Sequence, residues 1–208
     1  MAGQPAARLT RRPSDLALFA VTVVELAALV RLTPTFGLAD GIYLLQHLLV
    51  LGIALTRRPP TALDRSPTTA VAIVVALSYP YAQVIWLRWT AGTPAWPGAG
   101  LALVTVSAGL SLASLLALGT LFGYRPALRA LTTGGPYAFV RHPMYLAYLI
   151  GDVGYNLEEW NLGTLALVLA GWTSLLWRVH AEERILARDG GWRAYARAVP
   201  WRLIPGVW

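Results

Sequence analysis

A short polar segment, residues 135–145, interrupts a chain that is otherwise strongly apolar. It reads GPYAFVRHPMY, so an arginine and a histidine stand side by side with a tyrosine on either flank. Further along the chain, Glu182 and Glu183 form an adjacent pair of carboxylates. Polar and charged side chains beside membrane-length apolar stretches are costly and are retained where they bind something. Cationic, phenolic and anionic groups together suit a small ligand that carries both signs of charge.

Turn and helix-start signals surround Arg141 and His142. Residues 133–136 read TGGP, which predicts a turn because Gly supplies unusual backbone angles and Pro fixes one. Pro143 suits the first turn of a helix, where its missing N–H is no loss. His142 is then expected at the helix cap, beside the positive end of the helix dipole, which favours an anion. Tyr145, three residues later, is expected near the same face.

The composition of the chain is that of a membrane protein. Of its 208 residues, 56% are hydrophobic and only 13% are charged, which excludes an ordinary soluble domain of this length. The chain has no cysteine, so disulfides and thiolate metal ligands are excluded, and no metal is expected. The net charge of +7 comes from arginines that lie between apolar stretches. This pattern indicates membrane topology, and no nucleic-acid partner is expected.

Four apolar stretches are long enough to cross a bilayer, which requires about 20 residues of helix. They are 14–32, 38–55, 68–89 and 98–122. A fifth apolar region begins at Pro143 and is broken at residues 156–161, which predicts a helical hairpin with a short first arm. We therefore expect an all-α polytopic membrane helical bundle of about five to six transmembrane segments, with a C-terminal helical hairpin and a cytoplasmic C-terminal tail.

The arginines predict the orientation of these spans. If the N-terminus is cytoplasmic, only Arg31 and Arg88 lie on the opposite side, and all the other arginines are cytoplasmic. Cytoplasmic loops carry an excess of basic residues, so this orientation is strongly favoured. Both termini and the segment around Arg141 are therefore expected on the cytoplasmic face. The composition hints at a bacterial inner membrane.

The groups of the polar segment match those that S-adenosylmethionine requires. The carboxylate of this molecule requires N–H donors or an arginine, and its ammonium requires a glutamate. Its adenine requires an apolar or aromatic wall. Neighbouring residues on a helix point about 100° apart, so one of Glu182 and Glu183 can face such a ligand while the other faces water or an arginine.

The C-terminal part of the chain, from about Leu131 to Trp208, resembles the isoprenylcysteine carboxyl methyltransferase and phospholipid methyltransferase superfamily. The resemblance rests on GGPYAFVRHPMYLAYLIG, followed by RVHAEERIL and by GWRAYARAVPWRLIPGVW. It implies that this region encloses S-adenosylmethionine and that a lipophilic small molecule or lipid enters sideways from the bilayer. Residues 123–208 are then the C-terminal cofactor-binding methyltransferase region. They follow a four-helix transmembrane region at 1–122 in one integrated membrane domain.

The resemblance also implies roles for individual residues. It implies an in-line methyl transfer that depends mainly on proximity, orientation and a water-poor site. From its position and chemistry, Arg178 is expected to anchor an anionic acceptor, since a guanidinium can bind a carboxylate in bidentate fashion. Glu183 is the second expected catalytic residue. A carboxylate acceptor, and so an O-methyltransferase, is favoured, with thiols and amines as alternatives. The expected cofactor-binding residues are Tyr137, Val140, Arg141, His142, Tyr145, Glu182, Glu183 and Tyr195.

Two other functions remain open from the sequence. The segment from Trp192 to Gly206 also resembles sterol reductases, which use NADPH, although their related motif usually has Asn at the position of Met144. The other alternative is a non-enzymatic membrane protein on the same fold. A transporter would be expected to show a paired repeat, and none is apparent.

Several candidates also have ordinary structural explanations. His142 can serve merely as a helix cap, and Arg178 can pair with Glu182 one helical turn later. Tyrosines and tryptophans are common at membrane interfaces, and Trp192 and Trp201 are expected there.

Two further carboxylates are expected inside the membrane. Glu25 lies in the middle of the first span, and an intramembrane carboxylate suggests a substrate role by default. It can equally pair with a polar side chain of the bundle, namely Gln46, His47 or Gln83. Asp152 is expected to face into the C-terminal hairpin.

Overall fold

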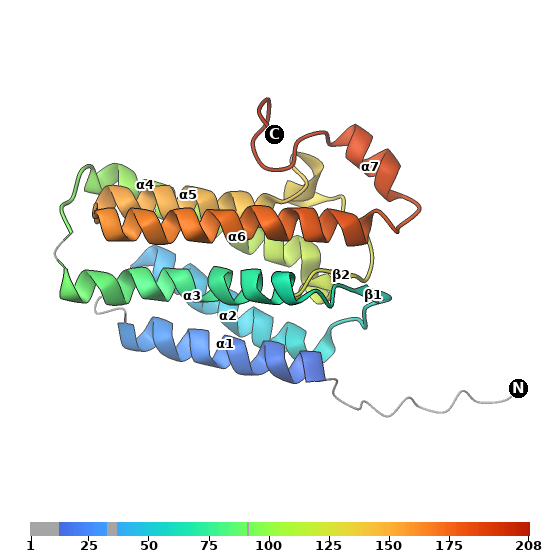
Figure 1. Cartoon of the computed structure of the whole chain (residues 1–208), viewed down its shortest axis with the longest axis horizontal. Helices are drawn as coiled ribbons and strands as arrows, with labels where there is room; N and C mark the ends of the chain where they lie inside the picture. Colours follow the sequence, from blue (N-terminus) through green and yellow to red (C-terminus); the bar gives the residue numbers. More distant parts are fainter. Residues whose placement is uncertain (1–12, 33–36, 91) are drawn as a thin grey trace, which may run out of the picture.

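The computed structural model describes residues 13–32, 37–90 and 92–208, which form a bundle of helices (Figure 1). The elements in chain order are α1 (Pro13–Leu32), α2 (Leu38–Thr56), β1 (Ala62–Leu63), α3 (Pro67–Trp89), α4 (Pro97–Leu118), η1 (Gly119–Leu121), β2 (Ala127–Leu128), η2 (Gly135–Ala138), α5 (Pro143–Glu158), α6 (Leu162–Leu186) and α7 (Trp192–Ala198). The two short strands pair in antiparallel fashion and tie the α2–α3 loop to the segment that follows α4. The prediction of an all-α membrane bundle is confirmed.

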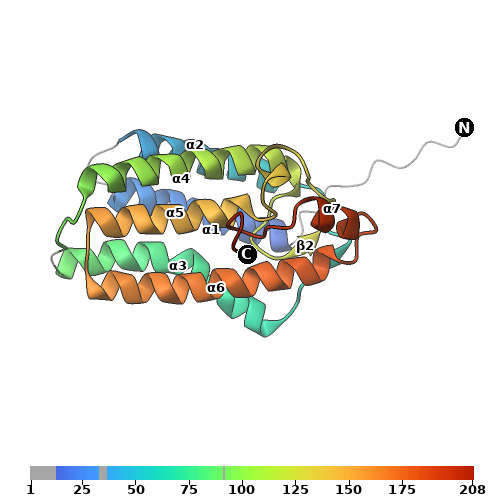
Figure 2. The same cartoon turned by 90° about the horizontal axis from the view of Figure 1, so that it is seen from above.

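The helices coincide with the apolar stretches of the sequence. The four predicted spans correspond to α1, α2, α3 and α4 with η1, and the interrupted fifth region forms the hairpin of α5 and α6. Within the described residues, four helices are long and apolar enough to cross a membrane: α2, α3, α4 with η1, and α6. Helices α1 and α5 run alongside them through the bundle (Figure 2).

Close packing of α4 on α5 depends on glycines. A Cβ atom on Gly154 would lie 2.8 Å from the carbonyl O of Gly100, and one on Gly100 would lie 2.7 Å from that of Gly154. Small residues allow membrane helices to approach this closely. Ser107 of α4 also donates a hydrogen bond of 2.7 Å to the carbonyl O of Ala147 on α5. These contacts fix α5, which follows the polar segment, against the rest of the bundle.

The tip of the α5–α6 hairpin lies beside the loop between α3 and α4. Thr93 and Trp160 exchange two backbone hydrogen bonds of 3.0 Å. The carbonyl O of Leu157 accepts from the amides of Ala95 and Trp96, both at 3.1 Å. Although α5 has only 16 residues, it therefore ends at the same end of the bundle as the α3–α4 loop.

Polar side chains face the inside of the bundle, and apolar side chains cover its outside. Val24 is 67% exposed, Val71 64% and Leu116 62%, whereas Glu25 and Asp152 are buried. Ionisable side chains in membrane helices face the bundle interior in this way, because lipid offers them no partner. The surface of the bundle is therefore suited to a lipid environment.

One end of the bundle gathers the two strands, α7 and the C-terminal tail (Figure 1). We call it the Arg-rich end, because Arg57, Arg58, Arg129 and Arg141 lie there. Arg57 Nε donates to Asp15 at 2.5 Å, and Arg129 Nε donates to the carbonyl O of Arg58 at 3.0 Å. The segment before α5, the end of α6 and α7 thus come together at a single end of the bundle.

Candidate active site

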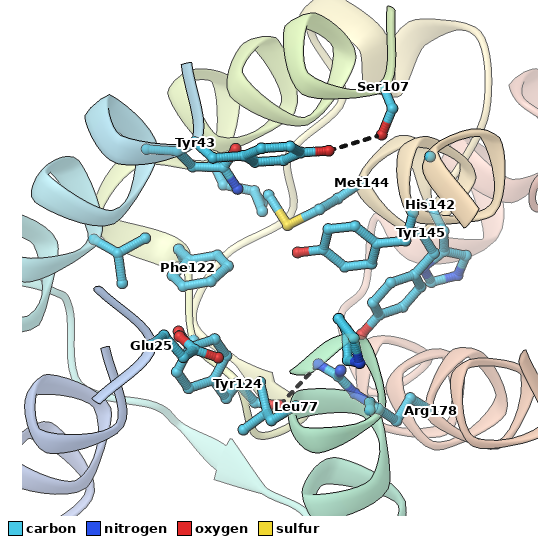
Figure 3. Close-up of a pocket in the computed structure, with 18 of the residues that line it drawn as sticks. Glu25, Tyr43, Leu77, Ser107, Phe122, Tyr124, His142, Met144, Tyr145 and Arg178 are labelled. Carbon is cyan, nitrogen blue, oxygen red and sulfur yellow. Dashed lines mark hydrogen bonds between the residues drawn. The ribbon is translucent and has the colours of Figure 1, made fainter. Parts of the chain in front are cut away.

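A cavity of about 850 Å³ runs along the inside of the bundle. Its wall includes His142 and Tyr195 at the Arg-rich end, and Asp40 and Glu158 at the opposite end. Figure 3 shows side chains from several helices that point into it. Ligand-binding sites commonly have volumes of about 300–1,000 Å³. The cavity thus connects the polar segment with the interior of the bundle.

The turn before α5 forms as predicted and positions His142. Gly135 adopts φ of 60°, a left-handed conformation that favours glycine, in the 3₁₀ helix η2. His142 is the N-cap residue of α5, and Pro143 follows at its first position. The amide of His142 donates to the carbonyl O of Arg202 at 2.9 Å, so the C-terminal tail holds this segment in place.

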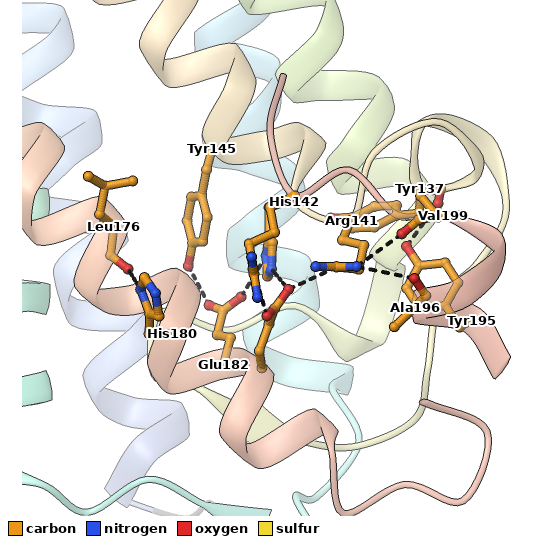
Figure 4. A network of polar contacts seen from close by, with 12 residues as sticks. Tyr137, Arg141, His142, Tyr145, Leu176, His180, Glu182, Tyr195, Ala196 and Val199 are labelled. Atoms are coloured by element: carbon orange, nitrogen blue, oxygen red, sulfur yellow. Dashed lines mark hydrogen bonds and ion pairs between the residues drawn. The ribbon is translucent and has the colours of Figure 1, made fainter. Parts of the chain in front are cut away.

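The imidazole of His142 lies between two carboxylates (Figure 4). Its Nδ1 is 3.6 Å from Glu182 Oε2, and its Nε2 is 3.5 Å from Glu183 Oε1. The side chain makes no hydrogen bond to its own helix, so it is not a capping side chain. Burial disfavours the charged ring, but the two carboxylates outweigh burial and raise the pKa of His142 above its ordinary value. The ring also stacks on Tyr145, with 5.7 Å between centroids.

Although Glu182 and Glu183 are adjacent, they face different partners. Glu182 accepts a hydrogen bond from the hydroxyl of Tyr145 and lines the cavity. Glu183 accepts from Arg141 Nε and from Arg202 Nε, both at 2.8 Å, and is not among the described residues that line the cavity. The rotation between neighbours on a helix separates the two roles. One carboxylate is available to a ligand, and the other ties down the C-terminal tail.

Arg141 links the segment before α5 to the end of α7. Its Nη1 donates to three carbonyl oxygens, of Ala196 at 3.3 Å, Val199 at 3.1 Å and Pro200 at 3.2 Å. With the bond from its Nε to Glu183, these contacts give the guanidinium a structural role. The side chain nevertheless forms part of the cavity wall.

Three buried aromatic side chains close the cavity at the Arg-rich end: Tyr137, Trp192 and Tyr195. The hydroxyl of Tyr195 donates to the carbonyl O of Tyr137 at 2.8 Å, and the Trp192 ring meets the Tyr195 ring edge-on at 5.8 Å. Burial raises the pKa of Tyr195 to about 12, so its hydroxyl remains a donor near neutral pH. The expectation that Trp192 is an interfacial residue is wrong, because α7 folds this ring onto the cavity.

Arg178 reaches the cavity from α6, one turn before Glu182. Its Nη2 donates to the carbonyl O of Tyr124 at 3.0 Å, and its guanidinium lies 5.1 Å from the centroid of Tyr145 (Figure 3). In the described structure it forms no ion pair with Glu182, so the spacing of the two residues does not produce the predicted alternative. Its Nε is buried and has no hydrogen-bond partner among the described residues.

Glu25 faces the same cavity from the middle of α1. Its carboxylate accepts a hydrogen bond from the hydroxyl of Tyr124, which also lies 3.2 Å from Thr22 Oγ1. His47 Nε2 is 3.9 Å from Glu25 Oε2. His47 is one of the partners that the sequence suggests, whereas Tyr124 was missed because it follows the fourth span and only the tertiary fold brings it to α1.

Asp152 joins three helices inside the bundle. It accepts from the hydroxyl of Tyr79 on α3 at 2.9 Å and from Trp172 Nε1 on α6 at 2.8 Å, and Gln83 is a further hydrogen-bond partner. The expectation that Asp152 faces into the hairpin is confirmed. Hydrogen-bond donors from α3 and α6 reach the carboxylate of Asp152 on α5. This carboxylate therefore fixes the three helices against one another.

Residues 97–189 match the family model described as phospholipid methyltransferase. This segment belongs to the phospholipid methyltransferase family. The superfamily expected from the sequence is therefore confirmed, and the apolar helices together with this family make the chain an integral membrane protein. No curated protein and no solved structure matches the chain.

The methyltransferase segment extends from the start of α4 to the turn that follows α6. It therefore includes His142, Arg178 and both adjacent glutamates, and it ends before α7. Tyr195 and Arg202 lie beyond it. These residues are joined to the methyltransferase segment by the tertiary contacts that Arg141 and Glu183 make.

Most of the predicted site residues line the cavity: Tyr137, Arg141, His142, Tyr145, Arg178, Glu182 and Tyr195. Glu183 lies behind the wall, bound to two arginines. Val140 lies instead in a separate apolar hollow with Pro136 and Pro143. No signal in the sequence distinguishes these two from their neighbours, because the direction of each side chain depends on the packing of α7 and the tail.

The cavity wall at the Arg-rich end combines three kinds of group. His142 offers a buried positive charge, which is held between Glu182 and Glu183. Glu182 offers a carboxylate, and Tyr137 and Trp192 offer buried aromatic surface. A ligand with an anionic group, a cationic group and a flat ring has a matching partner for each. S-adenosylmethionine carries all three groups, so the residues present fit it.

Proposed function

We propose that this protein is an S-adenosylmethionine-dependent membrane methyltransferase that methylates a lipophilic acceptor taken from the bilayer. One observation carries the proposal. Within a methyltransferase-family segment, Glu182 and the buried His142 beside it meet buried aromatic rings on a single cavity wall.

The proposed cofactor contacts follow from charge and burial. Glu182 would hold the ammonium, and the positive charge of protonated His142, whose pKa is raised by the carboxylates on either side, would attract the carboxylate of the ligand. Tyr137 and Trp192 would enclose the adenine. When bound, S-adenosylmethionine supplies a methyl group made electrophilic by the attached sulfonium. Glu183 acts indirectly, because it holds Arg141 in place.

Arg178 is proposed to bind the acceptor. Its Nε is unpartnered among the described residues, and the side chain lies on the cavity wall beside Tyr145. A guanidinium favours a carboxylate, which needs no base before methylation, so this arrangement supports O-methylation. The chain's contribution is then mainly the positioning of the acceptor in a site with little water.

Apolar side chains support entry of the acceptor from the bilayer. The cavity wall includes Leu29 of α1 and Leu77 and Val84 of α3, which suit a hydrocarbon part of the acceptor. We further propose that the Arg-rich end faces the cytoplasm of a bacterium across its inner membrane, with both termini on that side, because basic residues collect on the cytoplasmic side of membrane proteins.

Calorimetry of the purified protein in detergent tests the cofactor. S-adenosylmethionine is expected to bind, and NADPH in a parallel titration is expected not to bind. His142→Ala is expected to weaken binding of S-adenosylmethionine by about 10-fold or more, because it removes a positive charge from the cavity wall and the partner that positions Glu182. His180→Ala is the matched control, because His180 hydrogen-bonds to the carbonyl O of Leu176 in its own helix and is not among the described residues that line the cavity. Absence of S-adenosylmethionine binding would refute the proposal.

The chemistry of the transferred methyl group tests the acceptor. The protein is incubated with lipid extract and methyl-labelled S-adenosylmethionine, and the labelled lipids are treated with mild base. A methyl ester releases its label as methanol, whereas N-methyl and S-methyl groups keep it. Release of the label supports a carboxylate acceptor held by Arg178, and Arg178→Leu is expected to raise KM more than it lowers kcat. Retention of the label would exclude O-methylation of a carboxylate.

A further inference from the structure

Two buried glutamines face the cavity far from the proposed cofactor site. Gln46 on α2 is 9% exposed and Gln83 on α3 is 2% exposed, and both line the cavity. The Oε1 atom of each has no hydrogen-bond partner among the described residues. An acceptor oxygen left unpaired away from water is unfavourable. These two oxygens therefore mark a place where a ligand with donor groups gains interactions.

The neighbour of Gln83 fixes which atom of its amide is unpaired, and the structure places the amide of Gln46 in the same sense. Gln46 Nε2 donates to Ser111 Oγ at 3.0 Å. Gln83 is a hydrogen-bond partner of Asp152, and an ionised carboxylate only accepts, so the amide nitrogen of Gln83 must face it. Turning the Gln83 amide over would place oxygen against oxygen. The free atom of Gln83 is thus an acceptor, and the structure leaves Oε1 of Gln46 free as well.

The two oxygens lie at a similar depth in the bundle, on different walls. Gln46 lies about two turns from the start of α2, roughly 12 Å along the axis, and Gln83 lies somewhat less than two turns from the end of α3. The start of α2 and the end of α3 are both at the end opposite to the Arg-rich end (Figure 1). The glutamines are therefore in the half of the cavity away from His142 and Glu182.

We propose that Gln46 and Gln83 form a binding subsite for hydroxyl or N–H donors on the part of the methyl acceptor that is not methylated. The acceptor is then an amphiphile with a donor group on its remote part, and a plain hydrocarbon chain is a poorer ligand. Asp152 and Ser111 are positioning residues, because they hold the two amides with their oxygens free. This inference rests on the proposed function only in identifying the ligand as the methyl acceptor.

Paired probes that differ by one hydroxyl test the subsite. The wild-type protein in lipid nanodiscs is dialysed to equilibrium against labelled saturated fatty acids and their ω-hydroxy counterparts over a range of chain lengths, with empty nanodiscs subtracted. At the chain lengths that place the hydroxyl at the glutamines, the ω-hydroxy acid is expected to bind roughly 5- to 10-fold more tightly than the plain acid. One additional hydrogen bond contributes a factor of about this size. No S-adenosylmethionine is present, so failure here is distinct from failure of the proposed cofactor.

Two variants test whether the glutamines cause the preference for the ω-hydroxy acid. Gln83→Met keeps the volume of the side chain but removes its acceptor, and it is expected to abolish the hydroxyl preference while the plain acid binds as before or better. Gln46→Met, which releases Ser111 and leaves Asp152 untouched, provides the same test if Gln83→Met does not fold. Thr173→Val is the matched control, because Thr173 is exposed on the outside of α6 and bonds to its own helix. Equal binding of both probes at every length, or a preference that survives both variants, would overturn the subsite.

Discussion

Glu182 and Glu183 are neighbours in the chain, yet only Glu182 reaches the cavity wall. Glu183 points to the other side of α6, where two arginines hold it at 2.8 Å. Glu182 is thus placed to contact a ligand, whereas Glu183 anchors the C-terminal tail.

Exchanging each glutamate for glutamine should separate these roles. Glu182→Gln is expected to weaken S-adenosylmethionine binding by about 10- to 100-fold, because it removes the charge proposed to hold the ammonium. Glu183→Gln is expected to cost about 2 kcal/mol of stability, because buried Arg141 and half-buried Arg202 lose their charged partner. Calorimetry measures the first effect, and thermal unfolding in detergent measures the second. The reverse pattern would show that Glu183 is the cofactor contact.

Arg141 should control the attachment of α7. Arg141→Lys keeps the charge but loses the fork that reaches the carbonyls of Val199 and Pro200, so α7 is expected to detach more often, at a cost of about 1–3 kcal/mol. Limited trypsin digestion should then cut faster after Arg197. Arg188→Lys is the control, because Arg188 is exposed. Equal cleavage rates in both variants would contradict the structural role of Arg141.

His142 should make stability depend on pH. Its pKa is raised in the folded state, so the stabilisation from its charged form is complete below the ordinary histidine pKa of about 6.5 and is lost as pH rises through the raised value. The thermal midpoint is therefore expected to fall on going from about pH 6 to about pH 9. His142→Gln should flatten this profile. An unchanged slope in His142→Gln would show that the ring is not charged between the glutamates.

The α4–α5 contact should not tolerate a methyl group at Gly154. A Cβ there would meet the carbonyl O of Gly100 at 2.8 Å and the amide N of Val104 at 2.9 Å, so Gly154→Ala is expected to cost about 1–3 kcal/mol. Gly109→Ala is the matched control on α4, because a Cβ at Gly109 has nothing within 4 Å. That variant should be neutral or slightly stabilising, since alanine favours the helix. The midpoints of thermal unfolding of the Gly154→Ala and Gly109→Ala variants are compared. Equal midpoints would exclude tight packing at Gly154.

The sequence by itself determined the features that depend on local physics. The helix boundaries follow from the length of the apolar stretches and from the prolines at helix starts, and His142 at the cap follows from Pro143. The match to the methyltransferase family covers the segment whose motifs carry the resemblance, apart from α7 and the tail.

Tertiary structure decided which other side chains share the cavity with the predicted ones. Trp192 reaches the wall because Arg141 and Glu183 draw α7 and the tail over the site, and no local pattern encodes that approach. Gln46 and Gln83 lie 37 positions apart on different helices, and their free oxygens become a common feature only when α2 and α3 enclose the same space. The direction of a side chain inside a bundle depends on how whole helices pack, which composition and spacing do not determine.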